Sequence, residues 1–183
     1  MIAAIVLAAG ASTRFGQPKQ LAILGNQTLL ERAVRTAGEA GCKPVVVVLG
    51  AEADTIRERC HLDDAIVVVN DDWAEGMASS IRAGVAAIEV ADGAIVMTCD
   101  QPAVTVQHLR ALIASGGVTA SSYAGRSGVP AYFPMEFFPA LRNLTGDSGA
   151  REILHCAAAV ELENGELDVD TGKDLALARK LFA

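Results

Sequence analysis

The stretch that decides the fold reads IAAIVLAAGASTRFGQPK and runs from Ile2 to Lys19. Its first part, Ile2–Leu7, is a short apolar run, and we interpret it as a buried strand. The run lacks the basic flank of a signal peptide and is far shorter than the ~20 apolar residues that a membrane span needs. A loop with two glycines follows the strand directly, which is where a parallel sheet binds its ligands.

The composition of the chain agrees with a buried parallel sheet covered by helices. Of the 183 residues, 51% are hydrophobic and only 4% are aromatic, and the length predicts a single domain that spans residues 1–183. Fifteen Lys and Arg residues against 22 Asp and Glu residues give a net charge of −7, which argues against nucleic acid and membrane surfaces as partners. The four cysteines form no C-x-x-C pair, so we expect free thiols and a cytoplasmic location.

Short β-rich runs alternate with longer segments of helical period, which predicts an α/β fold with a mostly parallel sheet. After about residue 116 this alternation breaks down, and we expect antiparallel additions to the sheet in the C-terminal third. The runs that we expect to form strands are Ile2–Leu7, Val45–Leu49, Ala65–Val69, Ala94–Thr98, Val118–Ser122, Pro130–Phe133 and Ala158–Leu162.

Two helix starts carry capping sequences. Thr28 and Glu31 form a T-x-x-E capping box before apolar residues at helical spacing. Thr171 marks the start of the last helix, with Asp174 three residues further on.

The glycine loop has the residues of a phosphate-binding site. Its small residues allow the backbone of Leu7–Gly10 to approach a ligand, and free N–H groups there can bind phosphate oxygens. Arg14 adds a bidentate fork and Lys19 a point charge. The spacing fits neither G-x-x-x-x-G-K-[ST] nor G-x-G-x-x-G, which disfavours a kinase-type phosphate loop and a dinucleotide-binding fold. The alternative is a solvated loop whose glycines only make turns.

Three aspartates follow expected strands or precede an expected helix. Asp100 comes just after the run Ala94–Thr98 and should project at the carboxyl edge of the sheet, although an aspartate there can also cap a helix. Asp170 precedes the last helix and can likewise be a cap. Asp168 shares a face with Asp170 if the segment is extended.

Two further loops lead into helices. Asn70 to Ser80 joins an expected strand to a helix that should begin near Ile81; its polar groups can bind a base edge or a phosphate, but Ser79 or Ser80 can equally be a simple N-cap. Trp73, the only tryptophan, can stack on a ligand or cover the core.

The second loop, Thr145–Arg151, is a glycine-rich turn into a helix. Asp147 or Ser148 is expected to cap this helix, and Arg151 can reach an anionic acceptor.

The stretch Leu7–Lys19 matches every defined position of L-A-[AG]-G-x-S-x-R-[FM]-G-x-x-K, and the chain thereby resembles the MobA-like nucleotidyltransferases. The resemblance covers essentially the whole chain. It implies a three-layer sandwich with a Rossmann-like sheet of the nucleotide-diphospho-sugar transferase type, and the A-A-G form of the loop is similar to the cytidylyl branch of the family. The later matches are Asn70–Trp73 with Gly76, Met77, Ser80 and Gly84, then Cys99–Pro102, Thr145–Arg151 and Asp168–Thr171.

The resemblance implies an Mg²⁺-dependent enzyme that transfers CMP from CTP to a phosphorylated pterin, the molybdenum cofactor, and releases pyrophosphate. It implies catalytic roles for Arg14, Lys19 and Asp100. Asp100 and Asp170 are the implied Mg²⁺ ligands, with Asp168 the weaker candidate. Candidates for binding the acceptor are Asp147 and Arg151. The implied nucleotide-binding positions are Leu7, Ala8, Ala9, Gly10, Arg14, Lys19, Gly76, Met77 and Ser80.

Other functions remain open at this point. Gly128–Pro130 reads Gly-Val-Pro where many relatives have Gly-His-Pro, which leaves the acceptor undetermined. A nucleotidyltransferase for a sugar or alditol phosphate would use the same loop and Asp100. A non-catalytic nucleotide- or cofactor-binding partner of a molybdenum hydroxylase is a third hypothesis, and such a hydroxylase is also a candidate recipient protein. The spacing of the histidines supports no zinc site, and no G-x-S-x-G elbow is present.

Overall fold

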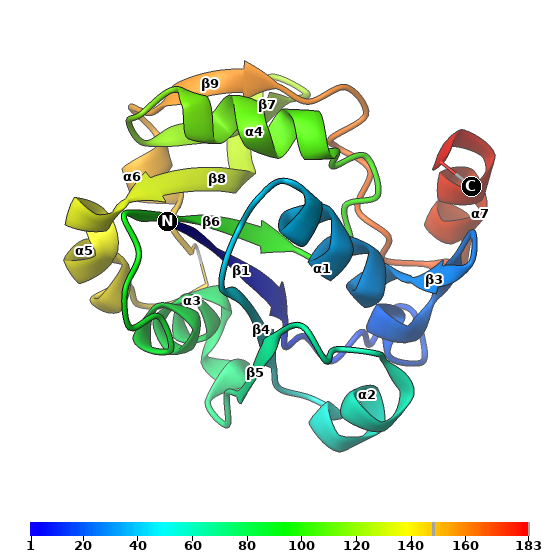
Figure 1. The fold of residues 1–183 in the computed structure, drawn as a ribbon. Helices are drawn as coiled ribbons and strands as arrows, with labels where there is room; N and C mark the ends of the chain where they lie inside the picture. The colour runs from blue at the N-terminus through cyan, green and yellow to red at the C-terminus, as the bar shows by residue number, and fades with distance from the viewer. Residues whose placement is uncertain (148, 183) are drawn as a thin grey trace.

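The computed structural model describes residues 1–147 and 149–182, and its centre is a seven-stranded sheet. The strands of the sheet are β1 Ile2–Ala8, β4 Val45–Leu49, β5 Ile66–Val69, β6 Gly93–Thr98, β7 Thr119–Tyr123, β8 Arg126–Pro134 and β9 Ala158–Glu161. Their order is β5-β4-β1-β6-β8-β7-β9 (Figure 1). All neighbours are parallel except β8, which runs antiparallel to both β6 and β7. The expected mostly parallel sheet with an antiparallel addition in the C-terminal third is confirmed.

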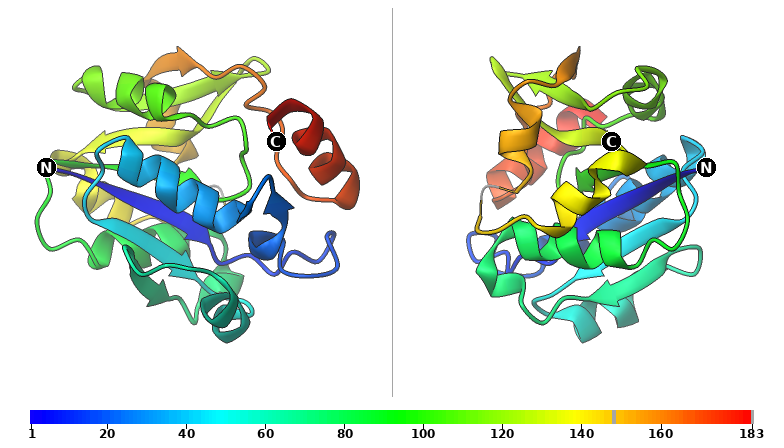
Figure 2. Two further views of the ribbon diagram at one scale, coloured as in Figure 1. Left: turned by 45° about the vertical axis from the view of Figure 1, so that its right-hand side comes forward. Right: turned by 90° about the vertical axis from the view of Figure 1, so that its left-hand side faces the viewer.

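Helices cover both faces of the sheet and give three layers (Figure 2). The helices are α1 Leu29–Glu39, α2 Ala53–Arg59, α3 Met77–Ala86, α4 Val106–Ala114, α5 Phe138–Arg142, α6 Arg151–Leu154 and α7 Gly172–Phe182. One core forms where α1, α2 and α4 pack on the sheet, through residues such as Leu30, Ile56 and Leu109. The second core forms on the opposite face under α3, α5 and α6, through residues such as Ile81 and Leu141.

Strand β1 lies between β4 and β6, and its residues Ala3–Val6 are fully buried. Because both faces of the sheet are covered, the strand needs apolar side chains on both sides, which explains its continuous apolar sequence. Helix α3 approaches β1 closely at Gly84, where an added Cβ would overlap the Cγ2 of Ile5. The central strand therefore brings the glycine loop to the carboxyl edge of a rigid sheet.

A smaller unit lies at one side of the molecule. The hairpin of β2 (Ile23–Leu24) and β3 (Gln27–Thr28) lies beside α7, as Figure 1 shows. A third apolar cluster, which includes Leu24, Val169 and Leu175, joins the two. The Arg179 guanidinium also donates to the Ile23 carbonyl at 3.0 Å. This third cluster connects the segment before α7 to the chain that follows the glycine loop.

The predicted capping sequences of α1 and α7 are both present as structures. Thr28 Oγ1 accepts from the Glu31 amide at 3.1 Å, and Glu31 Oε2 accepts from the Thr28 amide at 2.8 Å. At α7, Asp174 Oδ2 accepts from the Thr171 amide at 2.7 Å, and the Asp174 amide donates back to Thr171 Oγ1 at 3.3 Å. Local sequence alone explains these two helix starts.

Two expected caps are wrong. Helix α3 begins at Met77 rather than near Ile81, and its N-cap is Gly76, so neither Ser79 nor Ser80 caps it. Asp147 does not cap α6, whose N-cap is Ala150. Ser148, the other expected cap, lies outside the described residues. Both errors have the same cause, since polar residues near a helix start can bond to other segments instead of their own helix.

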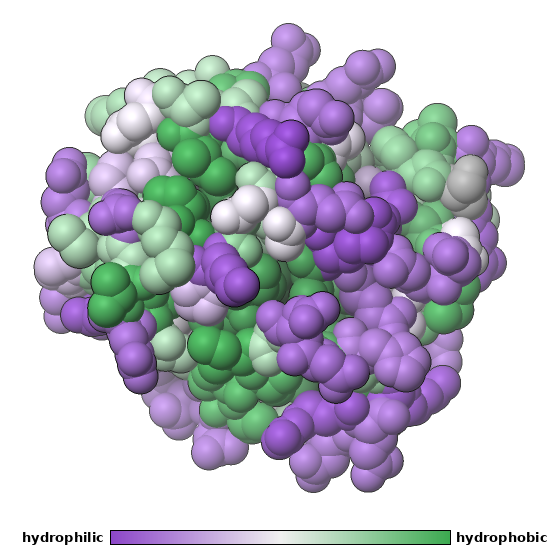
Figure 3. Space-filling model, in the orientation of Figure 1, coloured by the Kyte–Doolittle hydropathy of each residue, from purple (hydrophilic) through white to green (hydrophobic). Residues whose placement is uncertain are grey.

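On the face drawn in Figure 3, hydrophilic residues cover much of the right and lower parts, and apolar residues gather toward the centre and the left. On the side of α7 and the hairpin, Ile23, Leu177 and Leu181 are exposed. Within the described part of the chain, no helix combines the length and apolar character that crossing a bilayer requires.

Candidate functional site

The glycine loop is held from the inside by one buried amide. Gln20 Nε2 donates to the carbonyl oxygens of Ala8 at 2.8 Å and Gly10 at 3.0 Å, and Gln20 is almost fully buried. Ser12 Oγ donates to Gln20 Oε1 at 3.2 Å and accepts from the Lys19 amide at 3.1 Å. The loop is therefore preorganised by its own side chains before any ligand binds.

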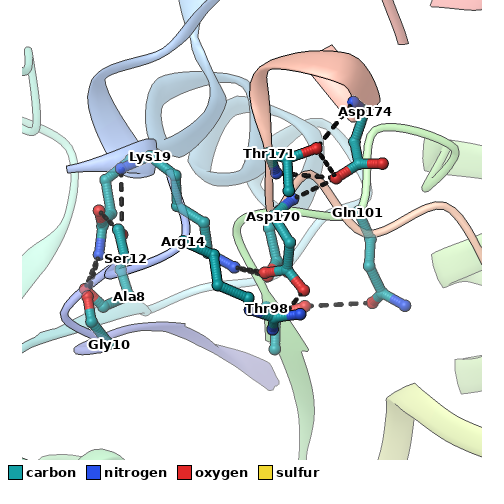
Figure 4. A network of polar contacts seen from close by, with 12 residues as sticks. Ala8, Gly10, Ser12, Arg14, Lys19, Thr98, Gln101, Asp170, Thr171 and Asp174 are labelled. Atoms are coloured by element: carbon teal, nitrogen blue, oxygen red, sulfur yellow. Dashed lines mark hydrogen bonds and ion pairs between the residues drawn. The ribbon is translucent and has the colours of Figure 1, made fainter. Parts of the chain in front are cut away.

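Four of the predicted site residues form one charge cluster. Lys19 Nζ lies 2.5 Å from Asp100 Oδ2 and 2.6 Å from Asp170 Oδ1. Arg14 Nη2 lies 2.7 Å from Asp170 Oδ2, on the solvent side of the cluster (Figure 4). Lys19 and Asp100 are each only 15% exposed, whereas Arg14 is 73% exposed. Three chain segments far apart in the sequence thus meet at the ends of β1 and β6.

The charge cluster is held together by the charge of Lys19. Burial by itself lowers the pKa of this lysine, but the charge of Asp100 and its hydrogen bonds to Asp100 and Asp170 outweigh burial and raise the pKa above the ordinary value. Lys19 is therefore a cation at neutral pH. It neutralises carboxylates that are also well placed to bind a metal ion.

Among the aspartates of the site, Asp100 has a carboxylate oxygen that is free to bind a cation. Its Oδ1 atom is buried and has no hydrogen-bond partner among the described residues, whereas buried polar atoms are normally satisfied. In the same part of the chain, no three His, Cys, Asp or Glu side chains are placed to hold a metal ion by themselves. Two carboxylates, Asp100 and Asp170, suit Mg²⁺, which takes few protein ligands and completes its shell with phosphate oxygens and water.

Asp168 lies near this pair but is not part of the charge cluster. Burial and the charges of Asp100 and Asp170 together raise its pKa to about 6, although the charges of Lys19 and Arg126 oppose the rise. The backbone places it there because the Val169 amide donates to the Asp100 carbonyl at 2.9 Å. Asp168 faces a cavity instead of Lys19.

The cavity opens beside Asp100 and has a volume of about 650 Å³. It lies between the end of β6, the β7–β8 hairpin and α6, and four of the predicted candidates besides Asp100 line it: Met77, Asp147, Arg151 and Asp168. The other lining residues are Thr98, Gln101, Tyr123, Arg126, Ser127, Gly128, Val129, Ala150, Leu154 and His155.

The turn before α3 lies against the segment that contains Asp147. Gly76 has a φ of 108°, and a Cβ there would lie 2.8 Å from the Cα of Asp147, so only glycine fits this approach. The Met77 amide donates to Asp147 Oδ1 at 3.4 Å. The two predicted segments therefore meet at one wall of the cavity.

The side chains of Ser80 and Trp73 both contact other residues of the chain. Ser80 is buried, and its Oγ accepts from Asn70 Nδ2 at 3.1 Å. Trp73 packs over Gly50, where an added Cβ would lie 2.6 Å from the Trp73 Cβ and 2.7 Å from the Ala9 carbonyl oxygen. Trp73 is half-buried and lies beside the glycine loop, and this contact does not decide between the two hypotheses for it.

Sequence reasoning did not identify four residues of the site: Gln20, Gln101, Tyr123 and Arg126. Gln20 differs in no local way from a surface glutamine, because its role depends on the loop folding back over it. Gln101 and Tyr123 form a buried pair, with Gln101 Nε2 donating to the Tyr123 hydroxyl at 3.4 Å. Two features of the sequence could have pointed to residues of this group: Gln101 directly follows Asp100, and an Ala-Gly turn precedes Arg126.

Comparison with known proteins assigns the family. The family model of the MobA-like NTP transferase domain matches residues 4–164, and the chain belongs to this family. The nicotine blue oxidoreductase of Paenarthrobacter nicotinovorans is 34% identical over 99% of this chain and 95% of its own length. The molybdenum cofactor cytidylyltransferase of Escherichia coli strain K12 is 26% identical over 97% of this chain and 95% of its own length.

The crystal structure of Rv0371c from Mycobacterium tuberculosis H37Rv has the same fold, with a TM-score of 0.86 at 34% sequence identity. The match covers 98% of this chain and 97% of that one. A structure of Rv0371c in complex with manganese matches with a TM-score of 0.81 and 32% identity, over 98% of both chains. The expected fold class is thereby confirmed.

Proposed function

We propose that this chain is a cytidylyltransferase that moves CMP from CTP to the phosphate monoester of a molybdopterin-type cofactor and releases pyrophosphate. The observation that carries the proposal is the charge cluster, in which Lys19 contacts both Asp100 and Asp170 beside the glycine loop. Cations for a triphosphate and carboxylates for a divalent ion are thus combined at one sheet edge. The name of the Escherichia coli relative supports the choice of both substrates.

In this proposal the triphosphate of CTP lies along Leu7–Gly10. The side chains of Leu7, Ala8 and Ala9 are buried, so the contacts to phosphate come from the backbone. Arg14 and Lys19 bind the phosphate oxygens. Gly76 and Met77 contribute the turn beside the nucleotide, and Ser80 acts indirectly by holding Asn70.

Mg²⁺ is the proposed divalent ion, with Asp100 and Asp170 as its protein ligands. The unpartnered Asp100 Oδ1 supports this assignment among the described residues, and the manganese complex of Rv0371c supports a divalent ion in a relative. When bound, the ion supplies positive charge to the triphosphate. With Asp100 and Asp170 as ligands of the ion, the three N–H donors of Lys19 would be available to the phosphates.

The reaction itself needs little from the protein beyond position and charge. An oxygen of the acceptor phosphate attacks the α-phosphorus of CTP, and the bond from this phosphorus to the bridging oxygen of the β-phosphate breaks. Negative charge develops on the departing pyrophosphate, where Arg14 and Lys19 stabilise it. A phosphate monoester has its second pKa near 6 and is largely a dianion at pH 7, so no general base is required.

The other functions make different predictions. A sugar- or alditol-phosphate transferase would release pyrophosphate with those acceptors instead. A non-catalytic partner of a molybdenum hydroxylase would bind CTP without turnover. The name of the Paenarthrobacter relative suggests redox chemistry, which would appear as a change in oxidation state of nicotine blue without pyrophosphate release.

One assay separates these functions. Pyrophosphate release is measured with molybdopterin-type cofactor, Mg²⁺ and each of CTP, GTP and ATP, and again with sugar and alditol phosphates as acceptors. We expect release with CTP and the pterin only. A preference for GTP would overturn the choice of base, and release with a sugar phosphate alone would overturn the choice of acceptor.

Asp100→Asn tests the metal assignment. The change keeps the size of the side chain but removes the charge, and we expect turnover to fall at least about 10³-fold while CTP binding in the presence of EDTA is retained. Asp168→Asn is the matched control, because Asp168 lies outside the charge cluster. A larger loss from Asp168→Asn than from Asp170→Asn would reassign the second ligand.

A further inference from the structure

The cavity beside Asp100 has to admit an anion if the acceptor is a phosphate monoester. Its walls carry three carboxylates, Asp100, Asp147 and Asp168, which would repel such an acceptor. In the proposed function, Lys19 and Arg14 bind the triphosphate of the nucleotide, so neither is available to the acceptor. A phosphate in the cavity therefore needs positive charge from another source.

Arg126 supplies such a charge at the cavity wall. It is the first residue of β8 and pairs with Tyr123 across the two-residue turn Ala124–Gly125, whose φ angles are 48° and 72°. The guanidinium carbon lies 5.2 Å from the centre of the Tyr123 ring, within cation–π range. Among the described residues, no group forms a hydrogen bond or a close ion pair with this guanidinium, and the nearest interacting charge is the Asp168 carboxylate of the same cavity, so its five donors can turn to a ligand.

The Tyr123 ring, which lies beneath the Arg126 guanidinium, is held in place by hydrogen bonds to its hydroxyl. The Tyr123 hydroxyl donates to the Val129 carbonyl at 3.0 Å and accepts from Gln101 Nε2 at 3.4 Å. Gly128 leaves room for this hydroxyl, because a Cβ there would lie 2.6 Å from it. Gln101 also ties the ring to the end of β6, next to Asp100. The guanidinium thus packs on a Tyr123 ring that is held in place and is linked to the end of β6 through Gln101.

We propose that Arg126 binds the phosphate monoester of the acceptor and orients it toward the α-phosphate of the nucleotide, with Arg151 on α6 as the second cation of the cavity. The inference rests on the proposed function and adds a specificity determinant to it: the site selects phosphorylated acceptors over their unphosphorylated counterparts. A guanidinium fork fits two phosphate oxygens at once, which a lysine cannot do.

Binding of a simple phosphate monoester tests the inference without any turnover. Phenyl phosphate, with phenol as the neutral match, is titrated calorimetrically into the full chain and its variants. We expect Arg126→Gln to weaken phenyl phosphate binding at least about tenfold and Arg126→Lys to weaken it less, with phenol unaffected. Arg142→Gln removes an exposed arginine of α5 outside the cavity and should match the parent protein. Equal phenyl phosphate affinity in the parent protein and in Arg126→Gln would overturn the assignment.

Steady-state kinetics separate the acceptor from the nucleotide as the bound phosphate. Arg126→Gln should raise the KM of the phosphorylated acceptor at least about tenfold and leave the KM of CTP within about twofold. A rise in the KM of CTP instead would overturn the inference, because Arg126 would then bind the nucleotide. If no acceptor releases pyrophosphate but Arg126 is still needed for phenyl phosphate binding, the proposed function fails and the anion site stands. If turnover occurs and Arg126→Gln behaves like the parent protein, the proposed function stands and the anion site fails.

Discussion

Gly84 shows how closely this fold is packed at the scale of a single residue. In an exposed helix, replacing glycine by alanine stabilises by about 0.5–1 kcal/mol, because alanine has the better helix propensity. At Gly84 the new methyl group would overlap Ile5, so we expect Gly84→Ala to lower the free energy of unfolding by about 1–3 kcal/mol. Urea denaturation measures the free energy of unfolding of Gly84→Ala and of the parent protein.

Gly38 provides the matched control. It lies in α1, and an added Cβ there would have no neighbour within 4 Å, so Gly38→Ala should raise the free energy of unfolding by about 0.5–1 kcal/mol. Equal effects of the two substitutions would show that helix propensity, and not the contact of α3 with β1, decides the stability at Gly84.

Replacing Lys19 is expected to lower both the stability and the activity of the protein. Lys19→Met leaves two partly buried carboxylates without their shared cation, and we expect the free energy of unfolding in EDTA to fall by about 1–3 kcal/mol. Added Mg²⁺ should restore part of it, because the carboxylates can then share a divalent ion. The fall in kcat/KM should correspond to a loss of about 2–4 kcal/mol of transition-state stabilisation.

Arg14→Gln is the comparison for Lys19→Met. Arg14 is 73% exposed and contacts only Asp170 within the charge cluster, so its ion pair is screened by solvent. The free energy of unfolding should change by less than about 1 kcal/mol. A stability in EDTA that is the same for Lys19→Met and for the parent protein would contradict a structural role for the charge cluster.

At the scale of one element, the N-terminus of α1 should make stability depend on pH through Glu31. Burial alone raises the pKa of this carboxyl, but hydrogen bonds from the His61 and Thr28 amides outweigh it and lower the pKa. A lowered carboxyl pKa stabilises the folded state above the unfolded pKa of 4.5, and this stability is lost as pH falls through the folded value. Glu31→Gln should therefore cost about 1 kcal/mol at pH 7 and much less near pH 3.

The measurement is urea denaturation of Glu31→Gln and the parent protein across this pH range. Glu39→Gln, on the exposed end of the same helix, is the control and should show a smaller dependence. A difference between Glu31→Gln and the parent protein that stays constant from pH 7 to pH 3 would contradict the role of the ionised carboxylate.

Sequence patterns predicted the elements better than their arrangement. Six of the seven strands of the sheet match the expected runs to within one residue at each end, and β8 begins four residues before its expected run; the match is close because apolar runs bounded by turns are local signals. The β2–β3 hairpin and α2 were not predicted, since two-residue strands and a helix with only Ile56 buried carry almost no periodic signal. The antiparallel direction of β8 was expected only as a general possibility, because pairing depends on contacts distant in sequence.

The same limit applies to the candidate site. Arg14, Lys19, Asp100 and Asp170 could be predicted one by one from their motifs, but the contact of Lys19 with both carboxylates joins residues 81 and 151 positions apart. Ser80 illustrates the opposite case, because its motif position is clear while its hydroxyl is buried against Asn70. Motifs identify the residues, and only the folded chain shows which of them face each other.

At the scale of the whole molecule, ligand binding should raise thermal stability, because the site joins the N-terminal loop, β6 and the segment before α7. A ligand at about 100 times its Kd stabilises a protein by about 2.7 kcal/mol. We expect CTP with Mg²⁺ to raise the Tm by several degrees, and EDTA to remove most of that rise. Differential scanning calorimetry with CTP, GTP and ATP would contradict the proposed base preference if GTP gave the larger shift.

The third apolar cluster has a consequence for how this site can open. Asp170 belongs to the segment before α7, and α7 packs on the hairpin through residues such as Leu175 and Ala178, while Phe182 also packs against one of the main cores. A unit with so little buried surface opens at a lower free energy than the sheet does. We therefore expect local opening of α7 to separate Asp170 from Lys19 more often than the sheet displaces Asp100.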